Sequence, residues 1–423
     1  MGGPELLLEP INTPGVLSAK LLLEGGSAQD AHGSRGSHQL LASLMTRGCG
    51  PHDHLQLADL VEGRGAGLRC EAHEDGLLIS LRCASDDATD LLPLLAWMVV
   101  DAHLRPEQLT LERGLSIQAL QRQREDPFQI AVDGWRQLAY GNGGYGHDPL
   151  GVEEDLRALS LDQLRTLADG LTSRPSVLAI AGVWPSSLDA ALPFLPGFQD
   201  WNAATDQQSQ KQTTSQASVC SSPQRSDQTL ITQPIATEQV VVMLGQATLS
   251  HGHPDDLALR LLQCHLGMGM SSLLFRRLRE EHGVAYDVGL HHPSRAGSAP
   301  FIMHASTGSE RADITLQLLA QSWWELASSP LSDEDLSLAK SKFIGQMAHA
   351  QQTSSQRAER RVQLRGLGLA DDHDQRCLQD LEDLGAADLK RVAAEHLSRP
   401  CLSLCGPQSK LDDLSRAWAS ELS

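Results

Sequence analysis

The chain has 423 residues, of which 41% are hydrophobic and 21% charged, a composition typical of globular proteins and not of disordered ones. At about 150 residues per domain, this length predicts two or three compact domains. The 53 acidic residues outnumber the 34 basic ones and give a formal net charge of −19. Because this negative field repels phosphate backbones and anionic lipids, nucleic-acid binding and a membrane-surface role are disfavoured.

The sequence predicts no membrane-spanning helix, signal peptide or myristoylation site. The longest apolar run, at 91–100, is half of the about 20 residues that a membrane-spanning helix needs. The N-terminus carries Glu5 where a signal peptide has positive charge, and Leu6 where a myristoylation motif has Ser or Thr. The cysteines form no C-x-x-C pair, so we expect reduced thiols, with Cys401 and Cys405 buried on one strand and not binding a metal. We therefore expect a cytoplasmic protein.

Elements of the first half follow the order strand, helices, hairpin, helices, strand. Apolar residues with alternating or continuous spacing predict strands at 16–24, 67–73, 77–83 and 176–183. Amphipathic spacing predicts helices at 37–47, 54–62, 88–103, 106–124 and 128–140. Asp75-Gly76 joins the two middle strands, and this dipeptide favours a tight hairpin turn because both residues tolerate positive φ.

The second half repeats this order at an offset of roughly 220 residues, which indicates an internal duplication. Its predicted strands are 239–246, 284–290, 300–306 and 401–404, and its predicted helices are 254–266, 271–281 and those beginning at 309 and 332. Between the halves, 18 of the 27 residues from 207 to 233 are Gln, Ser or Thr, a composition typical of linkers.

The sequence thus predicts an α+β protein with two similar αβ domains, each a mainly antiparallel sheet covered by helices. The predicted divisions are 1–206, the linker 207–233, and 234–423.

One segment of the second half, 266–286, reads LGMGMSSLLFRRLREEHGVAY. Gly267 and Gly269 let backbone N–H and C=O groups approach another chain closely. Arg279 lies near a helix end and Tyr286 on the following strand, so a guanidinium and a phenol could converge on a peptide carbonyl or carboxylate. The loop lacks the Lys of a phosphate-binding loop.

This segment resembles the Gly-rich loop, helix and LRxxxGxAY stretch of the pitrilysin/insulinase family of zinc metallopeptidases, in the branch that includes mitochondrial processing peptidase. The passage from Asp126-Pro127 to Gly151 is also similar to a stretch of the family's first half. The resemblance implies that Gly267, Gly269, Arg279 and Tyr286 bind substrate, and that Arg279 and Tyr286 reach the zinc site of a partner or opposite half.

Catalytic members of this family carry H-x-x-E-H, in which two His bind zinc and the Glu activates water. Aligning Gly36 and Gly48 with the family places Gln39, Ala42 and Ser43 at these positions, and His38 is one residue out of register. The family's third ligand, a Glu, corresponds to the region 117–124, which contains no acid. We therefore expect no metal in this chain.

The remaining close histidine pairs are expected to be surface or capping residues, not ligands. They are His52/His54, His251/His253 and His291/His292. A run of arginines at helical spacing is expected to be a solvated face paired with nearby acids: Arg357, Arg360, Arg361 and Arg365.

Three functions remain open. The first is a non-catalytic subunit that binds peptide and supplies Arg279 and Tyr286 to a zinc-bearing, H-x-x-E-H partner of the same family. The second is a purely structural or assembly subunit with the same fold. The third is an autonomous metalloendopeptidase with unorthodox ligands.

Overall fold

A computed structural model describes residues 3–12, 15–201 and 228–422. They form two compact units, each built on one five-stranded sheet. The first unit takes described residues from 1–120, 148–220 and 349–371, and the second takes those from 121–147, 221–348 and 372–423.

The first sheet has the strand order β1-β7-β2-β6-β5, in which only the β1–β7 pair is parallel. Its strands are β1 (Glu5–Pro10), β2 (Val16–Glu24), β5 (Gly67–Ala72), β6 (Gly76–Ala84) and β7 (Ser176–Gly182). Leu17, Leu21 and Leu23 alternate with other residues along β2 and are fully buried, because they face the helices that cover this side of the sheet.

The covering helices of this unit come from the first half of the chain. They are α1 (Ser37–Met45), α2 (His54–Glu62), α3 (Ala88–Leu91), α4 (Pro93–Val100), α5 (Pro106–Gln123), α7 (Glu153–Ala158), α8 (Leu161–Asp169) and α9 (Leu188–Ala191). A small hairpin, β3 (Gly48–Cys49) and β4 (His52–Asp53), lies beside them. Short 3-10 turns occupy Ser27–Gln29, Ser85–Asp87, Leu171–Ser173 and Leu192–Phe194.

The second sheet has the order β10-β11-β9-β12-β8, again with only one parallel pair, β8–β12. Its strands are β8 (Leu230–Pro234), β9 (Gln239–Ala247), β10 (Asp287–His291), β11 (Pro300–Gly308) and β12 (Cys401–Gly406). This is the topology of the first sheet, strand for strand. The predicted α+β class and the internal duplication are therefore confirmed.

The helices of the second unit follow the same plan. They are α11 (Asp256–Gly267), α12 (Ala312–Ser328), α13 (Asp333–His349), α15 (His373–Asp383), α16 (Ala386–His396) and α17 (Gln408–Ala417). Two stretches, η5 (Phe275–Glu281) and η7 (Trp418–Leu422), are π-helical, and η6 (Ser309–Arg311) is a 3-10 turn. The predicted helix at 271–281 is thus a π-helix that begins four residues later.

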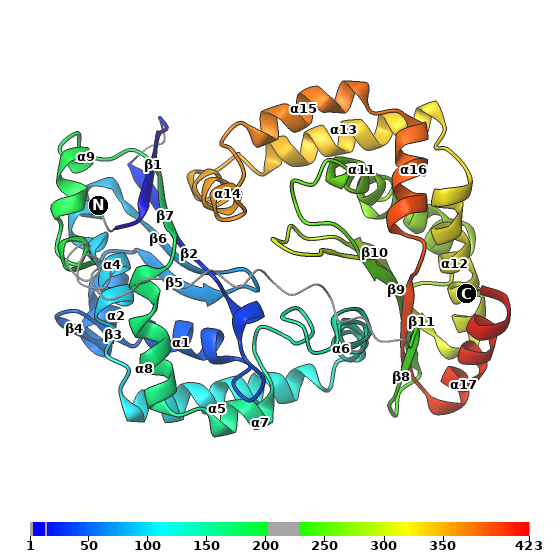
Figure 1. Ribbon diagram of the computed structural model, residues 1–423, viewed down its shortest axis with the longest axis horizontal. Helices are drawn as coiled ribbons and strands as arrows, with labels where there is room; N and C mark the ends of the chain where they lie inside the picture. The colour runs from blue at the N-terminus through cyan, green and yellow to red at the C-terminus, as the bar shows by residue number, and fades with distance from the viewer. Residues whose placement is uncertain (1–2, 13–14, 202–227, 423) are drawn as a thin grey trace, which may run out of the picture. The chain divides into compact units, whose positions relative to one another are not determined.

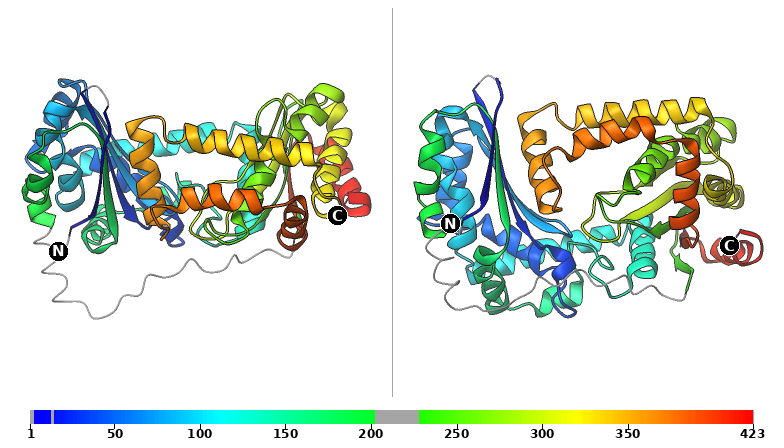
Figure 2. Two further views of the ribbon diagram at one scale, coloured as in Figure 1. Left: turned by 90° about the horizontal axis from the view of Figure 1, so that it is seen from above. Right: turned by 45° about the horizontal axis from the view of Figure 1, so that its top comes forward.

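Each unit takes one helix from the other half of the sequence. Helix α6 (Pro127–Tyr140) packs on β8, β9 and β12, whereas its counterpart α14 (Ser354–Gly366) packs on β2 and β7 (Figure 1). In the first unit, Figure 2 shows the sheet lying between its own helices and the orange α14. The compact units therefore do not coincide with the two sequence halves.

Helix α14 docks through the predicted arginine run and an apolar stripe. Arg357 donates to Glu9 of β1 with an N–O distance of 2.7 Å, and Lys20 of β2 donates to Glu359 at 2.9 Å. Ala358 and Val362 are fully buried between these ion pairs. The expected pairing with acids is confirmed. The acids are Glu5 and Glu9 of β1 and the nearby Asp371, and the face is half-buried, not solvated.

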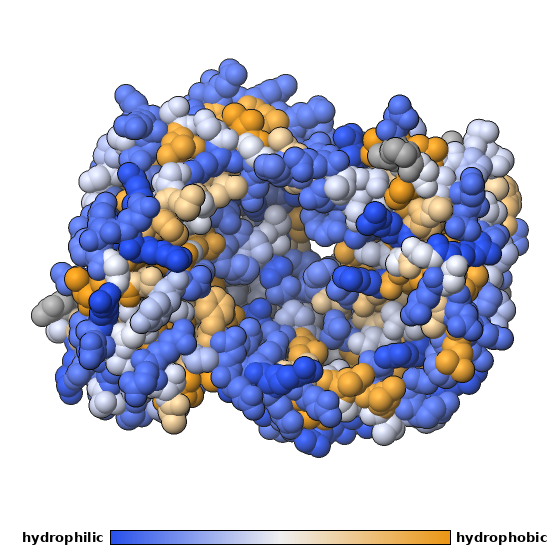
Figure 3. Space-filling view, turned by 180° about the vertical axis from the view of Figure 1, so that it is seen from behind, coloured by the Kyte–Doolittle hydropathy of each residue, from blue (hydrophilic) through white to orange (hydrophobic). Residues whose placement is uncertain are grey.

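Three other expectations concern the linker, the thiols and the membrane. Residues 207–227 of the predicted linker lie outside the described residues, and its last residues, 230–233, belong instead to β8. The seven described cysteines are not disulfide-bonded, and burial raises the pKa of the Cys405 thiol to about 11. Cys220 is outside the described residues. Among the described helices, none has the length and hydrophobicity to cross a bilayer. Hydrophilic residues cover most of the face in Figure 3.

Candidate functional site

The positions that correspond to the family's zinc helix lie on α1, and their side chains are already engaged or apolar. Gln39 is half-buried, and its Oε1 accepts a hydrogen bond from the backbone N–H of Ala72 at 3.0 Å. Ala42 is fully buried and offers no ligand atom. The Ser43 hydroxyl donates to the Gln39 carbonyl at 3.1 Å, within the same helix. None of these three positions presents a metal ligand.

His38, the neighbouring histidine, is a structural residue. Its Nε2 lies 3.1 Å from the guanidinium of Arg174, which can only donate, so Nε2 accepts and Nδ1 carries the proton. Nδ1 then donates to Asp30 at 2.6 Å. Asp30 also accepts from the N–H of Gly36 at 2.7 Å and so caps the start of α1. Both ring nitrogens are used, and no lone pair remains for zinc.

The region of the expected third ligand lies on α5 and at its end. The buried acid of this helix is Glu112, which pairs with Arg47 with an N–O distance of 2.6 Å. A carboxylate held by a guanidinium, without histidines facing it, is an ion pair and not a zinc ligand. The described residues at the positions of the zinc motif therefore do not fit a catalytic zinc ion.

Gln39 also contacts the free edge of strand β5, which lies beside α1. Strand β5 is the last strand of its sheet and pairs only with β6 within it. The backbone N–H of His73, just after β5, donates to the Gly76 carbonyl, so the backbone groups of His73 point toward β6. By the alternation of an antiparallel ladder, the backbone groups of Leu68, Cys70 and Ala72 point to the open edge. Because Gln39 already accepts from Ala72, its amide takes one of the positions that an added strand would use.

The two glycines of the 266–286 segment meet different physical needs. A Cβ on Gly267, the last residue of α11, would lie 2.7 Å from Cβ and 2.8 Å from N of Leu290, so the glycine lets α11 approach β10. Gly269 has a φ of +76° and open space around it, so it serves the turn. The neighbouring Met270 side chain is 73% exposed. Gly267 therefore makes its close approach inside this unit.

The arginines of η5 divide into engaged and unengaged ones. Arg277 donates to Ser322 and Glu325 of α12, both at 2.8 Å, and Arg276 lies 3.5 Å from Asp335 of α13. Arg279 is exposed, and its guanidinium stacks over the Phe275 ring at 5.2 Å. In the described part of the chain, no acid pairs with Arg279, and its side chain is exposed to solvent.

Tyr286 is presented by an anchored turn. Its backbone N–H donates to the Ser306 carbonyl at 2.8 Å, while its side chain is 75% exposed and its hydroxyl bonds to none of the described residues. Arg311 donates to the Gly283 carbonyl and Thr307 to the Val284 carbonyl, which holds the turn from both sides. Sequence reasoning missed these supporting residues, because carbonyl partners leave no signal in residue spacing.

The structure corrects the prediction for two histidines. His251 and His292 are buried, and both face Asp256, the first residue of α11. His251 Nδ1 lies 2.7 Å from Asp256 Oδ2, and Arg260 donates to the same oxygen at 2.8 Å. Burial raises the pKa of Asp256, but the hydrogen bond from His251 and the nearby side chains of His292 and Arg260 outweigh it and hold the pKa well below its ordinary value. The exposed His253 accepts from the Asp255 N–H at 3.1 Å, as expected of a capping residue.

Comparison with known proteins supports the resemblance seen in the sequence. Residues 189–343 match the family model described as "Peptidase M16 inactive domain". The chain is 22% identical over 361 residues to the Bacillus subtilis protein named "Uncharacterized zinc protease YmxG", covering 85% of each chain. It is 21% identical over 346 residues to a Streptomyces coelicolor protein named as an uncharacterized zinc protease, covering 81% of this chain and 74% of the relative.

Two solved structures share the fold. The peptidase M16 inactive domain from Pseudomonas fluorescens superposes with a TM-score of 0.84 at 20% identity, over 96% of this chain and 97% of that one. A protease from Helicobacter pylori superposes with a TM-score of 0.81 at 17% identity, over the same shares of the two chains. At these identities the superpositions establish the fold. The family match over 189–343 supports the resemblance to the pitrilysin/insulinase family that the sequence shows.

Proposed function

Since residues 189–343 match the Peptidase M16 inactive-domain family, we propose that this chain is the non-catalytic subunit of a heterodimeric zinc peptidase. A partner chain of the same family, bearing H-x-x-E-H, supplies the zinc and the water activator. This chain binds the peptide substrate and brings Arg279 and Tyr286 to the partner's zinc site.

The contrast between the two motif regions carries this proposal. On α1, the side chains of Gln39, Ala42 and Ser43 are engaged or apolar, so this chain does not activate water itself. On η5 and the turn after it, Arg279 and Tyr286 are exposed, while the neighbouring Arg277 is bonded to α12. Two donors without a structural task, on an anchored segment, are what recognition of a peptide requires.

The chemistry of the two side chains suits a peptide substrate. A guanidinium and a phenol both keep their protons at neutral pH, so both act as hydrogen-bond donors. Placed beside a scissile carbonyl, they would stabilise the negative charge that develops on its oxygen during hydrolysis. Placed beside a carboxylate of the substrate, Arg279 would position it through a charge-assisted hydrogen bond.

Backbone contacts are the second part of peptide binding in this proposal. The exposed loop at Gly269 and the open edge of β5 both present main-chain groups, and an extended peptide can add to such an edge as a further strand. Side chains of β5 that point away from the core include Arg69 and Glu71, which would meet alternate residues of an added strand.

The test is proteolysis by the mixture of this chain with an H-x-x-E-H partner. We expect no cleavage by this chain alone, and a loss of about 10–100-fold in kcat/KM when Arg279→Ala is mixed with the partner, since a charge-assisted hydrogen bond contributes about 1.5–3 kcal/mol. Tyr286→Phe should cost about 2–10-fold, because it removes one neutral hydrogen bond. Arg416→Ala, which removes an exposed arginine from α17, is the matched control and should leave activity unchanged.

The alternatives predict different results. Equal activity of the partner alone and of the mixture would indicate a purely structural subunit. Cleavage by this chain alone, abolished by chelators, would indicate an autonomous peptidase with other ligands. As the location we propose the cytoplasm, which suits the seven free cysteines of the described residues.

A further inference from the structure

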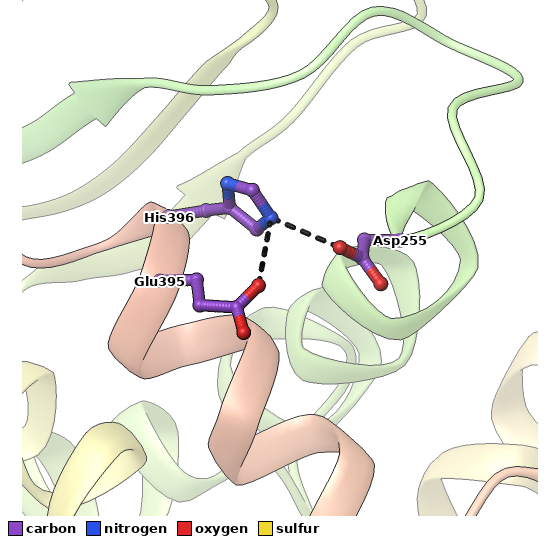
Figure 4. Close-up of side chains that lie close together, drawn as sticks. All are labelled: Asp255, Glu395 and His396. Atoms are coloured by element: carbon purple, nitrogen blue, oxygen red, sulfur yellow. Dashed lines mark hydrogen bonds and ion pairs between the residues drawn. The ribbon is translucent and has the colours of Figure 1, made fainter.

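Three ligand-bearing side chains meet where the start of α11 faces the end of α16. Asp255 immediately precedes α11, and Glu395 and His396 are the last two residues of α16 (Figure 4). His396 Nε2 lies 3.0 Å from Asp255 Oδ2 and 3.8 Å from Glu395 Oε2. One ligand atom from each of the three residues lies within 4.8 Å of the other two.

The two distances from His396 fit coordination of one small divalent ion. Zinc bonds to imidazole nitrogen and carboxylate oxygen at about 2.0–2.2 Å, so two of its ligand atoms lie roughly 2.9–4 Å apart for bond angles from 90° upward. Both distances from His396 Nε2 fall in this range. The side chains of Asp255 and His396 are 18% and 22% exposed, so solvent can complete the coordination shell.

Charge favours a cation at this place in spite of one arginine. Arg391 donates to Asp255 Oδ1 at 2.9 Å and to Glu395 Oε2 at 3.1 Å. It therefore leaves Asp255 Oδ2 to His396, whereas Glu395 Oε2 would bind the ion while accepting from Arg391. The two carboxylates carry two negative charges, and Arg391 carries one positive charge.

We propose that Asp255, Glu395 and His396 bind one divalent transition-metal ion, with Zn²⁺ as the expected occupant. One imidazole nitrogen and two carboxylate oxygens are donors that suit Zn²⁺, Ni²⁺ and Co²⁺ better than Ca²⁺ or Mg²⁺. The ion replaces the proton that His396 Nε2 shares with Asp255, and it ties the N-terminus of α11 to the C-terminus of α16. Because the site is exposed and has three protein ligands, it fills when metal is added and serves stability, not hydrolysis.

This inference is independent of the proposed peptidase role. It assigns any zinc that this chain takes up to the second unit and not to the degenerate helix α1. A zinc measurement on the wild-type chain therefore says nothing about catalysis unless the His396 site is removed first.

The test is a calorimetric titration of the metal-free full-length chain with ZnCl₂, accompanied by thermal unfolding with and without the ion. We expect saturable binding to one site, at least about tenfold weaker in His396→Ala and weaker also in the conservative Asp255→Asn. Zinc should raise the Tm of the wild type and should not raise that of His396→Ala. The matched control is His349→Ala, which removes an exposed histidine from the last turn of α13 and should bind zinc as the wild type does.

Two results would overturn the proposal. One is the lack of saturable zinc binding by the wild-type chain, which would show that the cluster holds only its ion pairs. The other is equal zinc affinity of His396→Ala, Asp255→Asn and the wild type, which would place the bound ion elsewhere. Circular dichroism of each variant shows whether it is folded. If either His396→Ala or Asp255→Asn does not fold, the zinc affinity of the other variant still tests the proposal.

Discussion

Gly267→Ala tests whether the first glycine of the Gly-rich loop is needed for packing inside the protein. The new methyl group would lie 2.7 Å from Leu290 Cβ and 2.8 Å from Leu290 N, whereas carbon atoms in ordinary contact are about 3.5–4.0 Å apart. Because one of these atoms is backbone, α11 and β10 must separate by about 1 Å.

The expected loss of stability follows from two opposing terms. Overpacking a well-packed contact costs about 1–3 kcal/mol. Replacing a helical glycine by alanine returns at most about 1 kcal/mol, and less at a helix end. The free energy of unfolding should therefore fall by about 1–2 kcal/mol in Gly267→Ala.

Gly345→Ala in α13 is the matched control, since an added Cβ there has nothing within 4 Å. It should raise the free energy of unfolding by about 0.5–1 kcal/mol. Urea unfolding of the three proteins, followed by circular dichroism, measures both changes. A Gly267→Ala variant that is as stable as the wild type, or gains as Gly345→Ala does, would refute the close approach of α11 to β10.

Two further predictions concern the buried ions and the exchanged helices. Asp256→Asn should lower the free energy of unfolding at pH 7 by about 3–5 kcal/mol, because it leaves Arg260 without its carboxylate. The folded-state pKa of Asp256 is lowered, so its ionised carboxylate stabilises the folded protein above the unfolded pKa of about 3.9. This stabilisation is lost as the pH falls below that value. The free energy of unfolding in urea should therefore depend less on pH between 7 and 3 in Asp256→Asn than in the wild type. The second prediction is that fragments 1–201 and 228–423, expressed together, copurify, because α6 packs on the second sheet and α14 on the first. Independent elution of the two fragments would contradict this exchange.

Most elements were predictable because local pattern and tertiary environment agree. Residues 16–24 and 54–62 have the boundaries that their spacing predicts, as β2 and α2. The helix predicted at 88–103 divides at Pro93, which begins α4 after the short α3. Strands β1 and β8 were missed, since each is a short edge strand that ends in proline and pairs in parallel with a distant segment.

The candidate site was predictable only as far as residue types decide it. The lack of ligand types at Gln39, Ala42 and Ser43 can be read from the sequence, since no fold supplies a donor atom that a side chain lacks. Which members of a charged run are engaged depends on neighbours far away in sequence. The salt bridge from Arg277 to α12 crosses almost fifty residues, and the bond from His38 to Arg174 crosses more than a hundred.

The sequence alone determined that the chain is a duplicated α+β protein without the zinc motif of the family that it resembles, because periodicity and residue chemistry are local properties. Only the tertiary structure decided that α6 and α14 are exchanged between the sequence halves and that His251 and His292 are buried against Asp256. It also decided that Arg279 has no acidic partner among the described residues, whereas Arg277 is bonded to α12. Burial and pairing depend on which surfaces the sheets and helices bring together. A short sequence pattern does not show which distant residues will lie next to it in the fold.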